Sequence, residues 1–107
     1  MAHPTNYYNA SANADNAIAT ATIAAVAGNY LEAISCTFGY SGAVPANAIL
    51  TLKDNATTIL TIPVKENGQI SLDGYVSAGV NTNLSASLSA SGSGGNVGYV
   101  NLTARHR

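Results

Sequence analysis

Apolar and polar residues alternate with a period of two along most of this chain, which is the pattern of β-strands with one buried face. In residues 83–91, leucines and alanines alternate with four serines, and in residues 48–53 Leu50 and Leu52 alternate with polar neighbours. The pattern predicts strands at residues 17–27, 30–40, 48–53, 58–65, 69–76, 83–91 and 96–104. About seven strands, with turn signals roughly every ten residues, predict an all-β fold: an antiparallel β-sandwich of the Greek-key or jelly-roll type.

The pattern is ambiguous in residues 17–27 and clearer in residues 30–40. Residues 17–27 are rich in alanine, which also suits a helix, but β-branched residues alternate with alanine near their centre. That alternation favours a strand. Within residues 30–40, Ile34, Cys36 and Phe38 are two positions apart, so we expect them to share the inward face.

Local residue preferences refine the neighbouring segments. Pro63 has no backbone N–H to donate, so residues 58–65 are expected to form an edge strand or to end there. Asn67 and Gly68 follow, and both residue types accept the positive φ of a type I′ turn. The sequence therefore predicts a hairpin that joins residues 58–65 to residues 69–76.

The first sixteen residues show no regular apolar pattern. They contain several asparagines and one proline, so residues 1–16 are predicted to be an irregular arm before a β-sandwich domain of residues 17–107. The arm's aromatic residues are Tyr7 and Tyr8, which either pack on the domain itself or anchor the arm to a neighbouring chain, because aromatic residues are enriched in interfaces. Removal of residues 1–16 is expected to leave the domain folded.

Composition narrows the classes of partner. Only 8% of the residues are charged and the net charge is −1, whereas about a quarter are charged in a typical soluble domain. Four basic residues cannot form the basic face of a nucleic-acid-binding protein, and no basic amphipathic helix or long apolar run indicates a membrane partner. The few charges and the small core favour a homo-oligomer, expected to be a trimer. The serines of residues 83–91 fit a solvated sheet face or a face packed on another subunit.

Reactive side chains do not form a recognisable site. His3 and His106 are far apart in the sequence, and zinc needs three or four ligands. Cys36 lies on a predicted inward face, where cysteine acts as a small buried apolar residue. Asp54 and Glu66 lie in predicted turns and are expected to be solvated there. We therefore expect no catalytic residues, no metal, no cofactor and no enzymatic activity.

The whole pattern resembles a group of small bacteriophage virion proteins, those of the head decoration or cement type. The resemblance covers residues 17–104 and lies in the alternating Ala-, Ser-, Thr-, Asn- and Gly-rich strands, the segment LTLKD at 50–54 and the closing segment VGYVNLT at 97–103. It implies a β-sandwich or jelly-roll domain, often a trimer, that binds the major capsid protein on the outer capsid surface and stabilises the shell.

A second class of function stays open at this point. A phage tail or fibre adhesin, or a carbohydrate-binding β-sandwich module, would bind sugars against aromatic rings. Candidate rings are Tyr7, Tyr8, Tyr30, Tyr40, Tyr75 and Tyr99. A fimbrial or surface-layer subunit, which exchanges a strand with its neighbour, is a third possibility.

Overall fold

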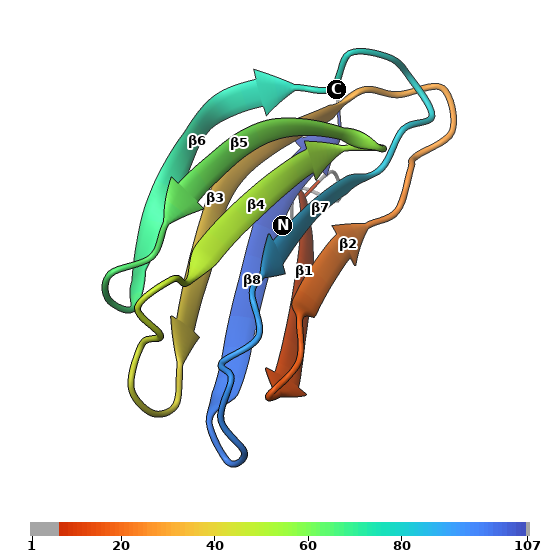
Figure 1. The fold of residues 1–107 in the computed structure, drawn as a ribbon. Coiled ribbons are helices and arrows are strands. Elements are labelled where there is room, and N and C mark those ends of the chain that lie inside the picture. The colour runs from red at the N-terminus through yellow and green to blue at the C-terminus, as the bar shows by residue number, and fades with distance from the viewer. Residues whose placement is uncertain (1–6, 107) are drawn as a thin grey trace, which may run out of the picture.

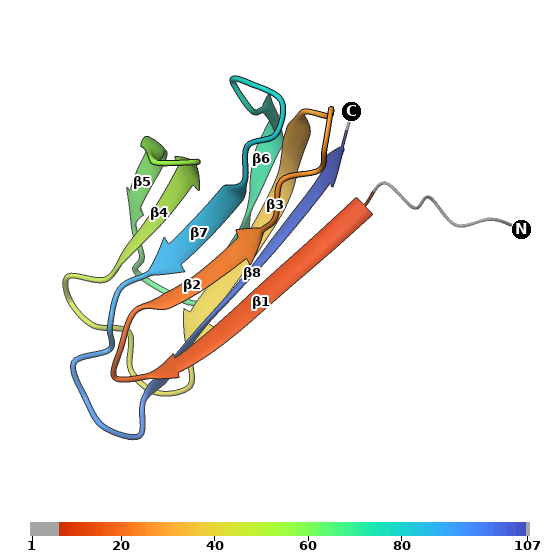
Figure 2. The ribbon, with the colours of Figure 1, turned by 90° about the vertical axis from the view of Figure 1, so that its right-hand side faces the viewer.

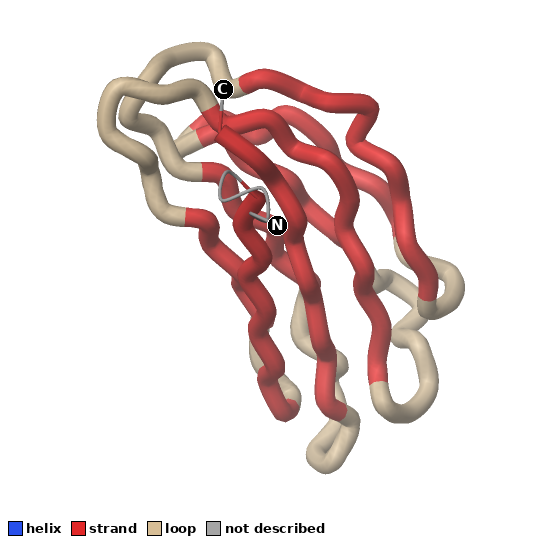
Figure 3. Tube along the Cα trace, turned by 180° about the vertical axis from the view of Figure 1, so that it is seen from behind, coloured by secondary structure: helices blue, strands red, loops and turns tan. Residues whose placement is uncertain are grey.

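The structure is a computed structural model that describes residues 7–106. Along the chain the strands are β1 (Tyr7–Asp15), β2 (Ala19–Ile23), β3 (Leu31–Tyr40), β4 (Ile49–Asp54), β5 (Thr57–Pro63), β6 (Gly68–Val76), β7 (Leu84–Leu88) and β8 (Val97–His106). They form two antiparallel sheets packed face to face, sheet A with the order β1-β8-β3-β6 and sheet B with the order β2-β7-β4-β5 (Figure 1). Loops join the strands at the two ends of the sandwich (Figure 3). Within residues 7–106, no helix is long and apolar enough to cross a membrane.

The strand pairing is that of one long hairpin wound into two sheets. β4 and β5 meet at a tight turn, where Asn55 has a φ of 55°. Outward from that turn, β3 pairs with β6, β2 with β7 and β1 with β8. The β3–β8 and β4–β7 pairings then complete each sheet. This is the strand order of the jelly roll, and the predicted all-β sandwich is therefore confirmed, with eight strands rather than seven.

The prediction of an irregular arm over residues 1–16 is wrong for β1. This strand pairs with β8 at nine consecutive positions, from Tyr7 opposite Arg105 to Asp15 opposite Val97. Its inward residues are mostly alanines and two of its five outward residues are asparagines, and both types are depleted in strands. The alternation was therefore present but weak, and the boundary at residue 17 falls in the β1–β2 turn. Residues 1–6 lie outside the described residues.

A β-bulge corrects one predicted face. The register of β3 with both of its neighbours shifts between Ala33 and Ser35. Cys36 and Phe38 are buried as expected, whereas Ile34 is only half-buried and Ala33 is buried in its place. A bulge adds one residue to a strand, so the inward face moves by one position there. The period of two that fits Cys36 and Phe38 therefore assigns the wrong face when it is extended back to Ile34.

The predicted Asn67–Gly68 hairpin does not form. β5 pairs with β4 in sheet B and β6 pairs with β3 in sheet A, so the chain crosses between sheets at this point. Neither residue has a positive φ. The Asn67 carboxamide instead forms two hydrogen bonds of 3.0 Å with the Tyr40 backbone: its oxygen accepts from the Tyr40 N–H, and its nitrogen donates to the Tyr40 carbonyl oxygen. The expectation that the strand with Pro63 lies at an edge is confirmed.

The spacing of the two sheets follows the size of the residues between them. On one side the inward residues are Ala10, Ala12 and Ala14 of β1 with Ala19 and Ala21 of β2, and β2 lies close to β1 and β8. On the other side, leucine, isoleucine, phenylalanine and tyrosine side chains of β3 to β6 hold the sheets further apart (Figure 2). The sandwich is therefore closed at β1–β2 and open at β5–β6.

Candidate functional site

Hydroxyl side chains cover the outer face of sheet B in rows that run across the strands. One row consists of cross-strand partners from all four strands: Thr20, Ser87, Thr51 and Thr61. The hydroxyls of Thr20 and Ser87 lie 3.0 Å apart. The adjacent row contains Thr22, Ser85, Lys53 and Thr58. We call these two rows the hydroxyl face, a surface of short neutral side chains in which Lys53 is the one charge.

The serine row expected over residues 83–91 divides at the end of β7. Ser85 and Ser87 stay on the hydroxyl face, but β7 ends at Leu88. Ser89 follows the strand and is half-buried; its carbonyl oxygen accepts a hydrogen bond of 2.7 Å from the Tyr40 hydroxyl, and its Oγ accepts one of 2.9 Å from the Ile49 N–H. These bonds tie β3 of sheet A to sheet B at one end of the sandwich.

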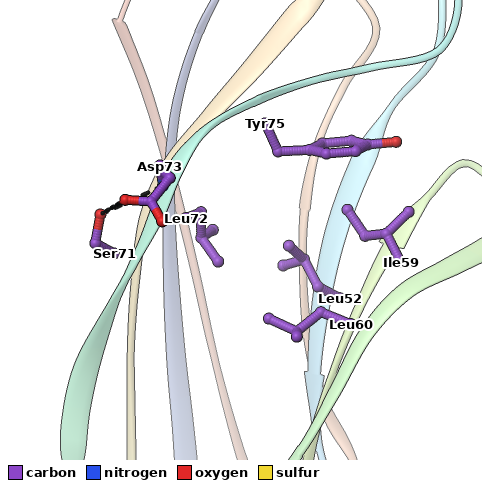
Figure 4. A pocket seen from close by; sticks show the side chains of 7 residues that line it. All are labelled: Leu52, Ile59, Leu60, Ser71, Leu72, Asp73 and Tyr75. Atoms are coloured by element: carbon purple, nitrogen blue, oxygen red, sulfur yellow. Dashed lines mark hydrogen bonds between the residues drawn. The ribbon is translucent and has the colours of Figure 1, made fainter.

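The open side of the sandwich holds an apolar groove between edge strands β5 and β6. It encloses about 280 Å³ and is lined by Leu52, Ile59, Leu60, Ser71, Leu72, Asp73 and Tyr75 (Figure 4). A second hollow of about 270 Å³ lies further along the same side, where Phe38, Ile62 and Ile70 are among its lining residues. The groove therefore follows from the divergence of the sheets.

Tyr75 and Asp54 close the groove at one end. The Tyr75 ring projects from β6 toward sheet B (Figure 4), and its hydroxyl donates a 2.9 Å hydrogen bond to Asp54 Oδ2. The Ala78 N–H donates a 2.7 Å hydrogen bond to the same oxygen. Burial, and then the Asp54 carboxylate, raise the pKa of Tyr75. Asp54 is itself buried, so the prediction that it is solvated in a turn is wrong: it joins the two sheets.

The polar residues beside the groove do not form a catalytic pair. Ser71 Oγ donates a 3.2 Å hydrogen bond to Asp73 Oδ1 and accepts one of 3.3 Å from the Asp73 N–H. Both side chains are exposed, and Asp73 has a φ of 53°. The contacts form a local turn around this strained residue, and among the residues that line the groove there is no histidine to act as a base for Ser71.

Tyr7 and Tyr8, the predicted interface residues, lie on opposite faces of β1. The Tyr8 hydroxyl is 2.7 Å from His106 Nδ1, and the centres of the two rings are 5.6 Å apart. Tyr7 is 48% exposed on the outer face of sheet A, opposite Arg105. The structure thus places one tyrosine within the domain and the other on its surface, and interface contact stays a prediction for both.

Glu32 and Arg105 form an ion pair on the outer face of sheet A. Arg105 Nε lies 2.6 Å from Glu32 Oε1, and this carboxylate, followed by the Tyr7 hydroxyl, raises the pKa of the guanidinium. The Glu32 carboxylate also lies over Gly74, where any Cβ would collide with it. Glu32 is buried, and the ion pair links β3 to β8. Its role is therefore structural.

The remaining reactive groups are also held within the fold. Cys36 is fully buried, and burial raises the pKa of its thiol to about 11, so it stays protonated at neutral pH. His3 lies outside the described residues. Among residues 7–106, no group of three or more His, Cys, Asp or Glu side chains is placed to hold a metal ion. Every buried side-chain nitrogen and oxygen in that range has a hydrogen-bond partner.

Sequence reasoning missed the contacts that hold the sheets together. Asp54 and Tyr75 are 21 positions apart and Tyr40 and Ser89 are 49 apart, so no local pattern indicates that they meet. No protein-family model fits the chain, and no curated protein is significantly similar to it. The candidate functional surfaces of the described residues are therefore the hydroxyl face and the open side.

Proposed function

We propose that this protein is a non-enzymatic virion protein of the head decoration type, which binds the outer surface of a bacteriophage capsid and stabilises it. The hydroxyl face carries the proposal. It crosses all four strands of sheet B with Lys53 as its one charge, and the centres of protein interfaces are depleted in charged residues. Short hydroxyl side chains lose little conformational entropy when a protein surface covers them.

Two further observations support an assembly role. The jelly roll is shared by viral capsid and lectin domains, so the fold is compatible with a virion protein, although a fold alone does not assign a function. Two of the five acidic side chains form contacts between strands or sheets: Glu32 with Arg105, and Asp54 with Tyr75. The proposed partners are the major capsid protein and other copies of this chain, with no cofactor.

The proposal is tested with capsids that lack the protein. Purified wild-type chain should bind them and raise their melting temperature. Ser87→Arg places a charge at the centre of the hydroxyl face and should weaken binding by about tenfold or more, because an unpaired charge is costly to bury. Gln69→Arg, at an exposed position of sheet A, is the matched control and should bind normally.

The outcomes are distinguishable. If the wild-type chain neither binds capsids nor occurs in purified virions by mass spectrometry, the decoration function is rejected. If it binds but Ser87→Arg binds equally well, the hydroxyl face is not the contact. Circular dichroism melting of each variant separates loss of binding from loss of folding.

The runner-up is a tail-fibre adhesin or carbohydrate-binding module, which the exposed rings of Tyr7 and Tyr30 favour. Aromatic rings are the usual platforms for sugars. Against it, Tyr8, Tyr40 and Tyr75 use their hydroxyls in contacts within the domain. A glycan array decides between the two: specific sugar binding that is lost in Tyr30→Ala, together with no binding to capsids, favours the adhesin.

A further inference from the structure

β1 forms a long free edge of sheet A. Its nine residues pair with β8 in one unbroken register, from Tyr7 to Asp15, and within residues 7–106 no strand pairs with its other side. In an antiparallel ladder every second residue turns its N–H and C=O groups away from the partner strand. The far side of β1 therefore presents a regular row of backbone donors and acceptors, which is a template for a further strand.

The other three edges carry features that hinder such pairing. β5 contains Pro63 and has a register shift opposite Leu52 and Lys53. β6 is interrupted by Asp73 and Gly74, both with positive φ. β2 has only five residues. β1 has no proline, no lysine and no bulge, and its one charged residue is Asp15 at its end. Edges that must stay unpaired are normally protected by such features.

The sequence of β1 is also self-complementary. Residues 9–13 read NASAN, which is the same in both directions about Ser11. In an antiparallel pair of two identical strands centred on Ser11, Asn9 would face Asn13 of the other copy, and Ala10 would face Ala12. A carboxamide both donates and accepts hydrogen bonds, so each asparagine pair is matched. No like charges face each other in this register.

We propose that β1 pairs in antiparallel register with β1 of a second copy about a twofold axis at Ser11, joining two A sheets into one continuous sheet. A twofold contact uses the same surface on both subunits and needs this kind of self-complementarity. The half-buried row of Ala10, Ala12 and Ala14 then gains a neighbour on its exposed side. The contact predicts a dimer in place of the trimer expected from composition, and it does not depend on capsid binding.

Sedimentation equilibrium tests the dimer and its register together. The wild-type chain should have about twice the 10.8 kDa mass of one chain at micromolar concentration. The double variant Asn9→Lys/Asn13→Lys places like charges opposite each other across the twofold axis and should be monomeric. Asn9→Lys/Asn13→Asp carries two new charges as well, but opposite signs face each other, so it should be dimeric again. Gln69→Lys, on the other edge of sheet A, should stay dimeric.

Disulfide cross-linking tests the axis at the level of single residues. Directly opposed Cβ atoms lie roughly 4.5–5.5 Å apart, close enough for a disulfide with small adjustments. Ser11→Cys should therefore form a covalent dimer on oxidation. Asn9→Cys and Asn13→Cys should each fail alone but cross-link when mixed. The native Cys36 is buried and contributes no background.

Several results would overturn the proposal. A wild-type monomer or trimer, a charge-swapped variant that stays monomeric, or an uncross-linked Ser11→Cys chain each rejects the twofold pairing. A wild-type monomer whose capsid binding is lost in Asn9→Lys/Asn13→Lys also rejects it and assigns the β1 edge to the capsid instead. Failure of capsid binding with a dimer intact rejects only the decoration function.

Discussion

Phe38 is the single phenylalanine of the chain and lies at the open side, where it lines the second hollow. Phe38→Ala should lower the free energy of unfolding by about 3 kcal/mol, at the low end for such a truncation, because one part of the ring already faces a hollow. Urea denaturation measures the change. A loss below about 1 kcal/mol, typical of an exposed site, would mean that the ring does not pack in the core.

Cys36 gives the stability of the protein a defined pH dependence. The native thiol has its pKa raised to about 11 from 9.0 by burial, so well below pH 9.0 it is protonated whether the chain is folded or not. Between these values the unfolded thiol loses its proton and the folded thiol does not. Stability therefore falls as pH rises through this window, by up to about 1.4 kcal/mol per pH unit from this group.

Comparison of wild type with Cys36→Ala isolates that contribution. The difference in unfolding free energy between the two should be constant from pH 7 to 8 and should shrink above pH 9.0, where the wild type loses stability. The thiol of the folded protein should also resist Ellman's reagent at pH 8. Rapid reaction under native conditions, or parallel pH profiles, would contradict the buried position of Cys36.

At the scale of single residues, the sequence predicted which side chains are buried better than it predicted which residues they contact. Burial of Cys36 and Phe38 followed from alternation, which is a local property. The role of Asp54 did not, because a carboxylate before a turn is ordinarily solvated. Its burial depends on Tyr75 and the Ala78 N–H, which only the packing of the two sheets brings to it.

β1 is the element whose removal tests the fold most directly. Deletion of residues 1–15 removes nine cross-strand pairs with β8 and uncovers its inward face, so it should lower the melting temperature by more than about 10 °C or unfold the chain. Deletion of residues 1–6 removes none of the described strands and is the matched control. If both deletions melt like the full chain, β1 contributes nothing to the domain.

The strands that the sequence predicted well share one property. In β4, β7 and β8, large apolar residues alternate with threonine, serine or asparagine, and the contrast between the two faces is strong. In β1 the inward residues are mostly alanine, and the contrast nearly disappears. The Asn67–Gly68 signal failed for a different reason: turn preferences are local, and the backbone of Tyr40 offered Asn67 better hydrogen bonds.

For the whole molecule, neutrality predicts how association responds to salt. The hydroxyl face contains only Lys53 as a charged residue and β1 only Asp15, so screening has little to act on. Raising the salt concentration from about 0.05 to 0.5 M should change the affinity of dimers or of capsid binding by less than about threefold. Sedimentation or capsid binding at several salt concentrations measures this. A steep decrease would show that ion pairs carry the contact.

The long hairpin that forms the jelly roll also sets the order in which the two sheets can form during synthesis. β8 lies at the centre of sheet A, between β1 and β3, and it is the last of the eight described strands to be synthesised. Until β8 is released, no strand links β1 to β3, although β3 can pair with β6, and only sheet B has all its strands available. Pairing of Tyr7 with Arg105 closes a loop that contains the six strands between β1 and β8, which is entropically costly and slow. A chain that stops before residue 97 therefore lacks the strand that joins β1 to β3, and sheet A cannot be completed before β8 is made.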